Sequence, residues 1–139
     1  MQKMIPFSPP DITKAEINEV IDTLKSGWIT TGPKTKELER RVAERCLTSK
    51  AVCLNSNTAC SEMTLRLLGV GPGDEVIVPA YTYTATASVV EHVGAKIVMV
   101  DCEPGKFSVD YDKLADAVTN KPKVIIPVDL FGIPADYNC

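Results

Sequence analysis

Short apolar segments alternate with helix-like segments along most of this chain, and this rhythm limits its fold more than any other feature. The apolar segments are too short for helices, rich in Val and Ile, and apolar on both faces: residues 51–55, 75–80, 96–101 and 123–129. Segments with helical spacing connect them, near 58–68, 84–93 and 110–119. Strands that are apolar on both faces are typical of buried parallel sheets. The pattern predicts an α/β fold with a mostly parallel sheet and helices on both of its faces.

Two further helices are expected ahead of the first apolar segment. Within residues 13–27 apolar side chains recur at helical spacing, and Thr13 with Glu16 fits a capping box. Gly27 is placed to end this helix. Pro33 opens the next helical segment at a position where its missing N–H is tolerated.

The composition argues against several classes of protein. A net charge of -3 and a pI near 5.2 disfavour nucleic acid as a partner, because no basic field would collect phosphates. The five cysteines form no CxxC pair and the lone histidine lies outside any cysteine cluster, so we expect no metal site. No apolar run could span a bilayer, and the first residues lack the apolar core of a signal peptide. We therefore expect a cytoplasmic protein without membrane contact.

The carboxyl ends of the strands are where ligands bind in such sheets. After the first apolar segment the sequence reads Asn-Ser-Asn-Thr-Ala and a helix begins, so free N–H groups and the hydroxyls of Ser56 and Thr58 could bind a phosphate. The alternative is that Ser56, Asn57 or Thr58 merely caps the helix. No GxGxxG follows this segment and no Walker A motif is present, which disfavours dinucleotide and nucleoside triphosphate sites.

Aromatic residues stand at the next strand end. Tyr81 and Tyr83 alternate with threonines after residues 75–80, and either ring could stack on a flat heterocycle. The alternative is a half-buried tyrosine that packs the corner between strand and helix. Together the two strand ends predict a site for a phosphorylated aromatic cofactor.

Five blocks in this order resemble the beginning of the DegT/DnrJ/EryC1/StrS family of sugar aminotransferases. They read GWITTGPKTKELE, LNSNTA, GPGDEVIVPAYTYTATA, GAKIVMVD and IIPVDLFGIPAD. The resemblance covers nearly the whole chain. It implies the large domain of a fold-type I aminotransferase and the cofactor pyridoxal 5′-phosphate (PLP).

The resemblance also assigns site residues. The segment Ser56, Asn57, Thr58 and Ala59 would hold the PLP phosphate, chiefly through backbone N–H groups and the Thr58 hydroxyl. Tyr83 would stack on the pyridine ring. Thr30 and Thr31 would contact the substrate, whereas Trp28 is expected to pack. Asp129 stands where the family commonly has a histidine, so a histidine-dependent role there is not expected.

The resemblance implies that residues 1–139 are the N-terminal portion of the large domain, without its remainder or the C-terminal small domain. The family's aspartate for the pyridine nitrogen and its Schiff-base lysine would lie beyond Cys139. We therefore expect no catalytic residue in this chain and no activity from it alone.

The function that the resemblance implies is transfer of an amino group, usually from glutamate, to a nucleotide-linked keto-sugar. Family members are homodimers, so a homodimer is expected. One alternative is a PLP-type sugar dehydratase of the same family. Another is a non-catalytic α/β module that needs a partner chain.

Overall fold

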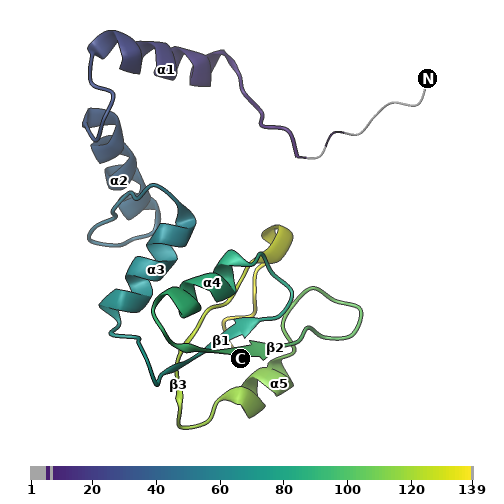
Figure 1. Ribbon diagram of the computed structural model, residues 1–139. Coiled ribbons are helices and arrows are strands. Elements are labelled where there is room, and N and C mark those ends of the chain that lie inside the picture. Colours follow the sequence, from purple (N-terminus) through teal and green to yellow (C-terminus); the bar gives the residue numbers. More distant parts are fainter. Residues whose placement is uncertain (1–5, 7, 139) are drawn as a thin grey trace, which may run out of the picture. The chain divides into compact units, whose positions relative to one another are not determined.

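The computed structural model describes residue 6 and residues 8–138 (Figure 1). The chain divides into two compact units, a first unit that ends at Cys53 and a second unit that starts at Leu54. None of the helices in the described residues combines the length and the apolar character needed to cross a lipid bilayer.

The first unit consists of helices α1 (Lys14–Ser26) and α2 (Pro33–Arg45). The expected capping box is present, since Thr13 accepts from the Ala15 N–H at 3.1 Å while Glu16 bonds back to the Thr13 N–H. Gly27 ends α1 in the left-handed conformation with φ 71°. These local signals confirm the two helices predicted ahead of the sheet.

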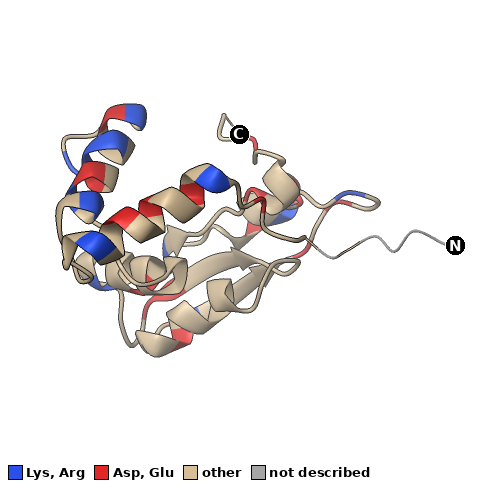
Figure 2. Ribbon diagram, turned by 90° about the horizontal axis from the view of Figure 1, so that it is seen from above, with Lys and Arg blue, Asp and Glu red and all other residues tan. Residues whose placement is uncertain are grey.

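Neither α1 nor α2 contains a buried residue. The apolar side chains that give α1 its helical spacing all remain exposed: Ile17, Val20, Ile21 and Leu24. Local interactions hold the second helix instead, because Arg40 and Arg41 both pair with Glu37 within α2. Figure 2 shows residues of both charges interspersed along the helices.

The second unit carries the sheet. Its elements are α3 (Asn57–Leu67), β1 (Glu75–Pro79), α4 (Ala85–His92), β2 (Lys96–Val100), α5 (Tyr111–Ala117), β3 (Pro122–Ile125) and the 3₁₀ turn η1 (Leu130–Gly132). The strands are all parallel in the order β2-β1-β3, with Glu75 opposite Lys96 and Pro79 opposite Val100. The predicted α/β class and parallel sheet are therefore confirmed.

The central strand β1 is buried on both faces, as its apolar sequence predicts. Val76 and Val78 pack into a core with Leu65 of α3 and Val89 of α4. The intervening Ile77 is also buried and faces a cavity that Leu114 of α5 helps to line. Since side chains alternate along a strand, α3 and α4 cover one face and α5 the other (Figure 1).

One predicted strand does not form. Residues 51–55 are irregular, and no strand among the described residues pairs with them. A strand needs a neighbour to satisfy its backbone, and here the Cys53 N–H donates instead to the Glu39 carboxylate at 2.9 Å. The fourth predicted segment, 123–129, is a strand only as far as Ile125. Pro127 lacks the N–H that would continue the ladder.

Candidate functional site

A cleft of about 570 Å³ opens in the second unit beyond the carboxyl ends of β1 and β3. It is lined by the start of α3, the β1–α4 connection and the segment after β3, with these residues: Asn57, Thr58, Ser61, Thr82, Tyr83, Ala85, Thr86, Val89, Ile126, Pro127, Val128, Asp129, Leu130 and Phe131. Three of the residues predicted for the cofactor, Asn57, Thr58 and Tyr83, thus meet at one cleft.

The start of α3 presents backbone N–H groups at one side of the cleft. Ser56 is the N-cap, and its Oγ accepts from the Ala59 N–H at 3.1 Å. The N–H groups of Asn57 and Thr58 have no acceptor among the described residues. The sequence predicts the Ala59 N–H as a phosphate donor, but in this structure Ser56 already uses it. The donors available to an anion are therefore those of Asn57 and Thr58.

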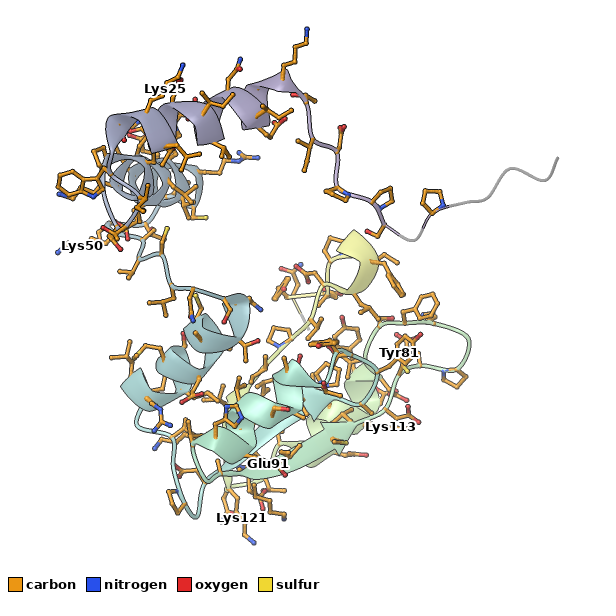
Figure 3. The ribbon with its side chains drawn as sticks, turned by 45° about the horizontal axis from the view of Figure 1, so that its top comes forward. Lys25, Lys50, Tyr81, Glu91, Lys113 and Lys121 are labelled. Carbon is orange, nitrogen blue, oxygen red and sulfur yellow. The ribbon has the colours of Figure 1, made fainter. Side chains whose placement is uncertain are left out.

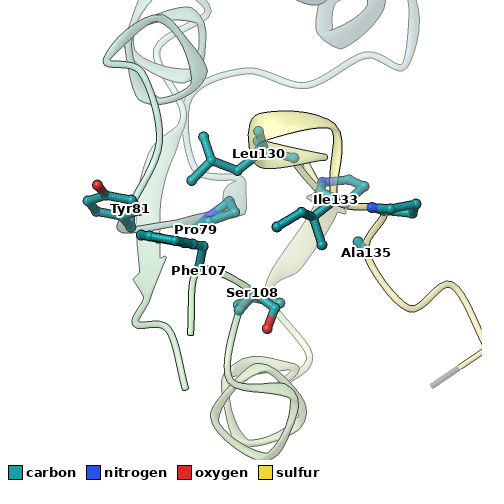
Figure 4. A pocket seen from close by; sticks show the side chains of 11 residues that line it. Pro79, Tyr81, Phe107, Ser108, Leu130, Ile133 and Ala135 are labelled. Carbon is teal, nitrogen blue, oxygen red and sulfur yellow. The ribbon is translucent and has the colours of Figure 1, made fainter. Parts of the chain in front are cut away.

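The two tyrosines after β1 occupy different places. Tyr83 lines the cleft, and the residue is 79% exposed. Tyr81 instead stacks on Phe107, with ring centroids 5.6 Å apart and an interplanar angle of 22°. Figure 4 shows these two rings side by side in a smaller pocket, and Figure 3 places Tyr81 at the end of the sheet opposite Lys121. Of these two tyrosines, Tyr83 is the one positioned to stack on a ligand in the cleft.

Hydroxyl groups that the sequence reasoning did not single out also line the cleft. Thr82 and Thr86 lie within hydrogen-bond distance of each other at 3.2 Å. Ser61 stands one helical turn after Asn57, on the same side of α3. That spacing is a signal from which Ser61 could have been predicted. The hydroxyls make the α3 and α4 side of the cleft polar.

Asp129 lies in the segment after β3, and its side chain bonds to residues further along that segment. Its Oδ1 accepts from the Ala135 N–H at 2.9 Å and from the Tyr137 hydroxyl at 2.8 Å. These two hydrogen bonds lower the pKa of the Asp129 carboxyl, the one from Ala135 more strongly. The same carboxylate raises the pKa of Tyr137. The bonds tie the two ends of the segment 129–137 together.

Phe131 lies within this closed segment and has an unusual backbone. Its φ of 56° and ψ of 23° are left-handed, which costs a bulky residue on the order of 1–3 kcal/mol. Its ring makes an edge contact with Phe107, with centroids 5.2 Å apart, and forms part of the cleft wall. Neither ring is buried, so packing in the core does not account for the conformation.

The residues predicted to contact substrate belong to the first unit. Thr30 and Thr31 are exposed, and the Thr31 carbonyl accepts from the Trp28 indole N–H at 2.9 Å. The Trp28 ring lies against Gly32, where an added Cβ would come within 2.3 Å of it. Trp28 therefore packs locally, as expected, and substrate contact by Thr30 and Thr31 stays a prediction.

A family model matches residues 10–138, that of the DegT/DnrJ/EryC1/StrS aminotransferase family. The chain belongs to this family. The match confirms the resemblance seen in the five sequence blocks. Among the residues that the structure describes, no three His, Cys, Asp or Glu side chains lie close enough together to hold a metal ion.

Solved structures of family members resemble this chain closely. Spr1654 of Streptococcus pneumoniae, assigned as a sugar aminotransferase, is 67% identical over 96% of the chain with a TM-score of 0.90. It has been solved in apo, PLP and PMP forms. DesV of S. venezuelae is 36% identical over 90% of the chain, with a TM-score of 0.82. The chain spans 34% of the length of each of these two proteins. The likeness confirms the predicted fold, the N-terminal portion of a fold-type I aminotransferase.

The residues of the cleft fit PLP, the cofactor that the sequence predicts for this DegT-family chain. The phosphate matches the free N–H groups at the start of α3. The pyridine ring matches the exposed ring of Tyr83 on the neighbouring wall. The cleft volume of about 570 Å³ lies within the range of roughly 300–1,000 Å³ typical of small-molecule sites.

Proposed function

We propose that this chain supplies the phosphate-binding and ring-stacking part of a PLP-dependent aminotransferase. The reaction is transfer of an amino group, from glutamate, to a nucleotide-linked keto-sugar. The observation that carries the proposal is one cleft that joins the start of α3 to Tyr83. The family match and the PLP and PMP forms of Spr1654 support it.

Each group at the cleft has a separate part in binding. The N–H groups of Asn57 and Thr58 donate to phosphate oxygens, helped by the positive end of the α3 dipole. The Thr58 hydroxyl adds a further donor beside them. Tyr83 covers one face of the pyridine ring, which limits the ring's rotation and excludes water from that face. When bound, PLP supplies an electron-withdrawing ring that stabilises negative charge at the substrate carbon.

The acid–base group of the reaction comes from elsewhere in this proposal. No lysine lines the cleft in the part of the chain that the structure describes. Residues 1–139 by themselves are therefore expected to bind cofactor without turnover. In its complete form the enzyme acts as a cytoplasmic homodimer, and Thr30 and Thr31 contact the sugar nucleotide.

The test is titration of the chain with pyridoxamine 5′-phosphate, which has no aldehyde to react with surface lysines. Tyr83→Ala should weaken binding about three- to tenfold, the scale of one aromatic stack. Tyr81→Ala is the matched control, because it removes a similar exposed ring that lies outside the cleft. Amide shifts of Asn57 and Thr58 should move on binding.

Equal affinity in the parent and in Tyr83→Ala would contradict the stacking role. A larger loss in Tyr81→Ala would place the ring in the pocket beside Phe107 instead. Sodium borohydride reduction with PLP, followed by peptide mapping, tests the second part of the proposal. One specifically labelled lysine together with turnover would show that this chain carries its own catalytic lysine.

A further inference from the structure

We propose that Asp129 is a positioning residue, which holds the Phe131 ring in place as a wall of the cleft. The role of that wall in cofactor binding rests on the proposed function, whereas the closure of the segment by Asp129 does not. Asp129 lies four residues after the end of β3 and lines the cleft.

The geometry of the segment 129–137 supports this role. The Asp129 side chain accepts two hydrogen bonds from the far end of the segment, at Ala135 and Tyr137. Its backbone carbonyl accepts a third from the Gly132 N–H at 3.2 Å. Asp129, the first residue of the segment, thus bonds both to its middle and to its far end.

Phe131 needs such support because its side chain is not packed into the core. Its backbone is left-handed, a conformation that a phenylalanine adopts only when its surroundings impose it. Phe131 is 69% exposed, and its aromatic neighbour Phe107 is itself half-exposed. Two backbone bonds bracket Phe131, one from the Gly132 N–H to the Asp129 carbonyl and one from the Ile133 N–H to the Leu130 carbonyl at 3.0 Å. The Asp129 side chain closes the segment around this turn through Ala135 and Tyr137.

The position of the ring matters because Phe131 faces the same cleft as Thr58 and Tyr83. Release of the segment would let the ring leave the wall and would widen the cleft on the side of β3. Asp129 therefore acts on ligand binding through Phe131 rather than by contact of its own with the reacting atoms.

The first experiment tests the closure without any ligand. Asp129→Ala should raise the exchange rate of the Ala135 amide about fivefold or more and should abolish the nuclear Overhauser contacts between the Phe107 and Phe131 rings. Asp129→Asn keeps an oxygen that can accept both bonds, so it should preserve the contacts. Asp116→Ala, at an exposed aspartate of α5, is the control. Unchanged exchange and ring contacts in Asp129→Ala would overturn the inference.

The second experiment is a double-mutant cycle with pyridoxamine 5′-phosphate as the probe. Asp129→Ala and Phe131→Ala should weaken binding by similar factors, and the double variant should be no weaker than Phe131→Ala. Additive losses would show that Asp129 acts independently of the ring and would overturn the inference. Absence of binding by the parent would count against the proposed function, while the exchange and ring measurements would still decide the role of Asp129.

Discussion

The two units of this chain use similar helical patterns with opposite results. In the second unit the apolar faces of α3 and α4 meet a sheet, and Leu65, Val89 and Val90 are buried. In the first unit the equivalent face of α1 meets no core among the described residues, and its four aliphatic side chains stay exposed. An amphipathic pattern therefore predicts a helix with an apolar face, but it does not show whether another part of the protein packs against that face.

What stabilises each unit differs accordingly. The second unit depends on apolar burial, where one aliphatic side chain contributes roughly 1.5–3 kcal/mol. The first depends on caps and on ion pairs along its helices, such as Glu37 with Arg40 and Arg41, which are weak because they are exposed to solvent. Short helices with only local support are marginal in water. We expect cooperative unfolding of the second unit and gradual melting of the first.

The largest contrast is expected from two matched leucine truncations. Leu65→Ala removes a side chain that is only 2% exposed and should lower the free energy of unfolding by about 2–5 kcal/mol. Leu24→Ala removes one that is 63% exposed and should change it by less than about 0.5 kcal/mol. Urea unfolding followed by a probe of the second unit measures both. A comparable loss in Leu24→Ala would show that the α1 face is covered in solution.

The contrast also explains which parts of the fold could be predicted from sequence. Sequence signals that act within a few residues predicted the ends of α1 correctly, namely the capping box at Thr13 and the left-handed C-cap at Gly27. The strands at residues 75–79 and 96–100 were predicted correctly because each finds its neighbouring strand within the second unit. Residues 51–55 have the same pattern, but a strand exists only beside a partner. Composition cannot show whether that partner is present.

The candidate site divides in the same way. The helix start at Asn57 and Thr58 and the ring of Tyr83 followed from the rule that ligands bind beyond strand ends. The cap at Ser56 is local too, yet its competition for the Ala59 N–H depends on the actual hydrogen bond. The left-handed Phe131 was not predictable, because the bonds that hold it join residues up to eight positions apart. No local propensity favours that conformation for phenylalanine.

A smaller effect should separate the two helix caps. Ser56→Ala removes the acceptor of the Ala59 N–H in the cooperative second unit and should lower its free energy of unfolding by about 1 kcal/mol. Thr13→Ala removes the matching bond of α1, but the loss should appear only as weaker helical amide shifts over residues 14–26. Heteronuclear spectra and urea midpoints measured on the same samples distinguish the two. A midpoint shift in Thr13→Ala would mean that α1 unfolds together with the sheet.

The smallest expected effect is on the stability of the chain at acidic pH, where we compare Glu37 in α2 with Glu62 in α3. Hydrogen bonds from Arg40 and Arg41 lower the pKa of Glu37 to about 2. Arg66 and, to a lesser extent, His92 of α4 lower the pKa of Glu62. Both folded-state pKa values lie below the ordinary value of 4.5. The stabilisation is therefore fully present above about pH 4.5 and is lost as the pH falls through each folded-state pKa.

The consequence of protonation should differ because the partners differ. The bond of Glu62 to His92 joins α3 to α4, so acid should lower the urea midpoint of the second unit as the pH falls below about 4.5. Glu62→Gln should flatten that dependence. Among the described residues Glu37 bonds only within α2, so Glu37→Gln should leave the midpoint curve unchanged and alter only the α2 amide shifts. Both pairs are solvent-exposed, and added salt should shrink both effects. Equal flattening by the two variants would contradict the separation, since it would require α2 to unfold in the same cooperative step as the sheet.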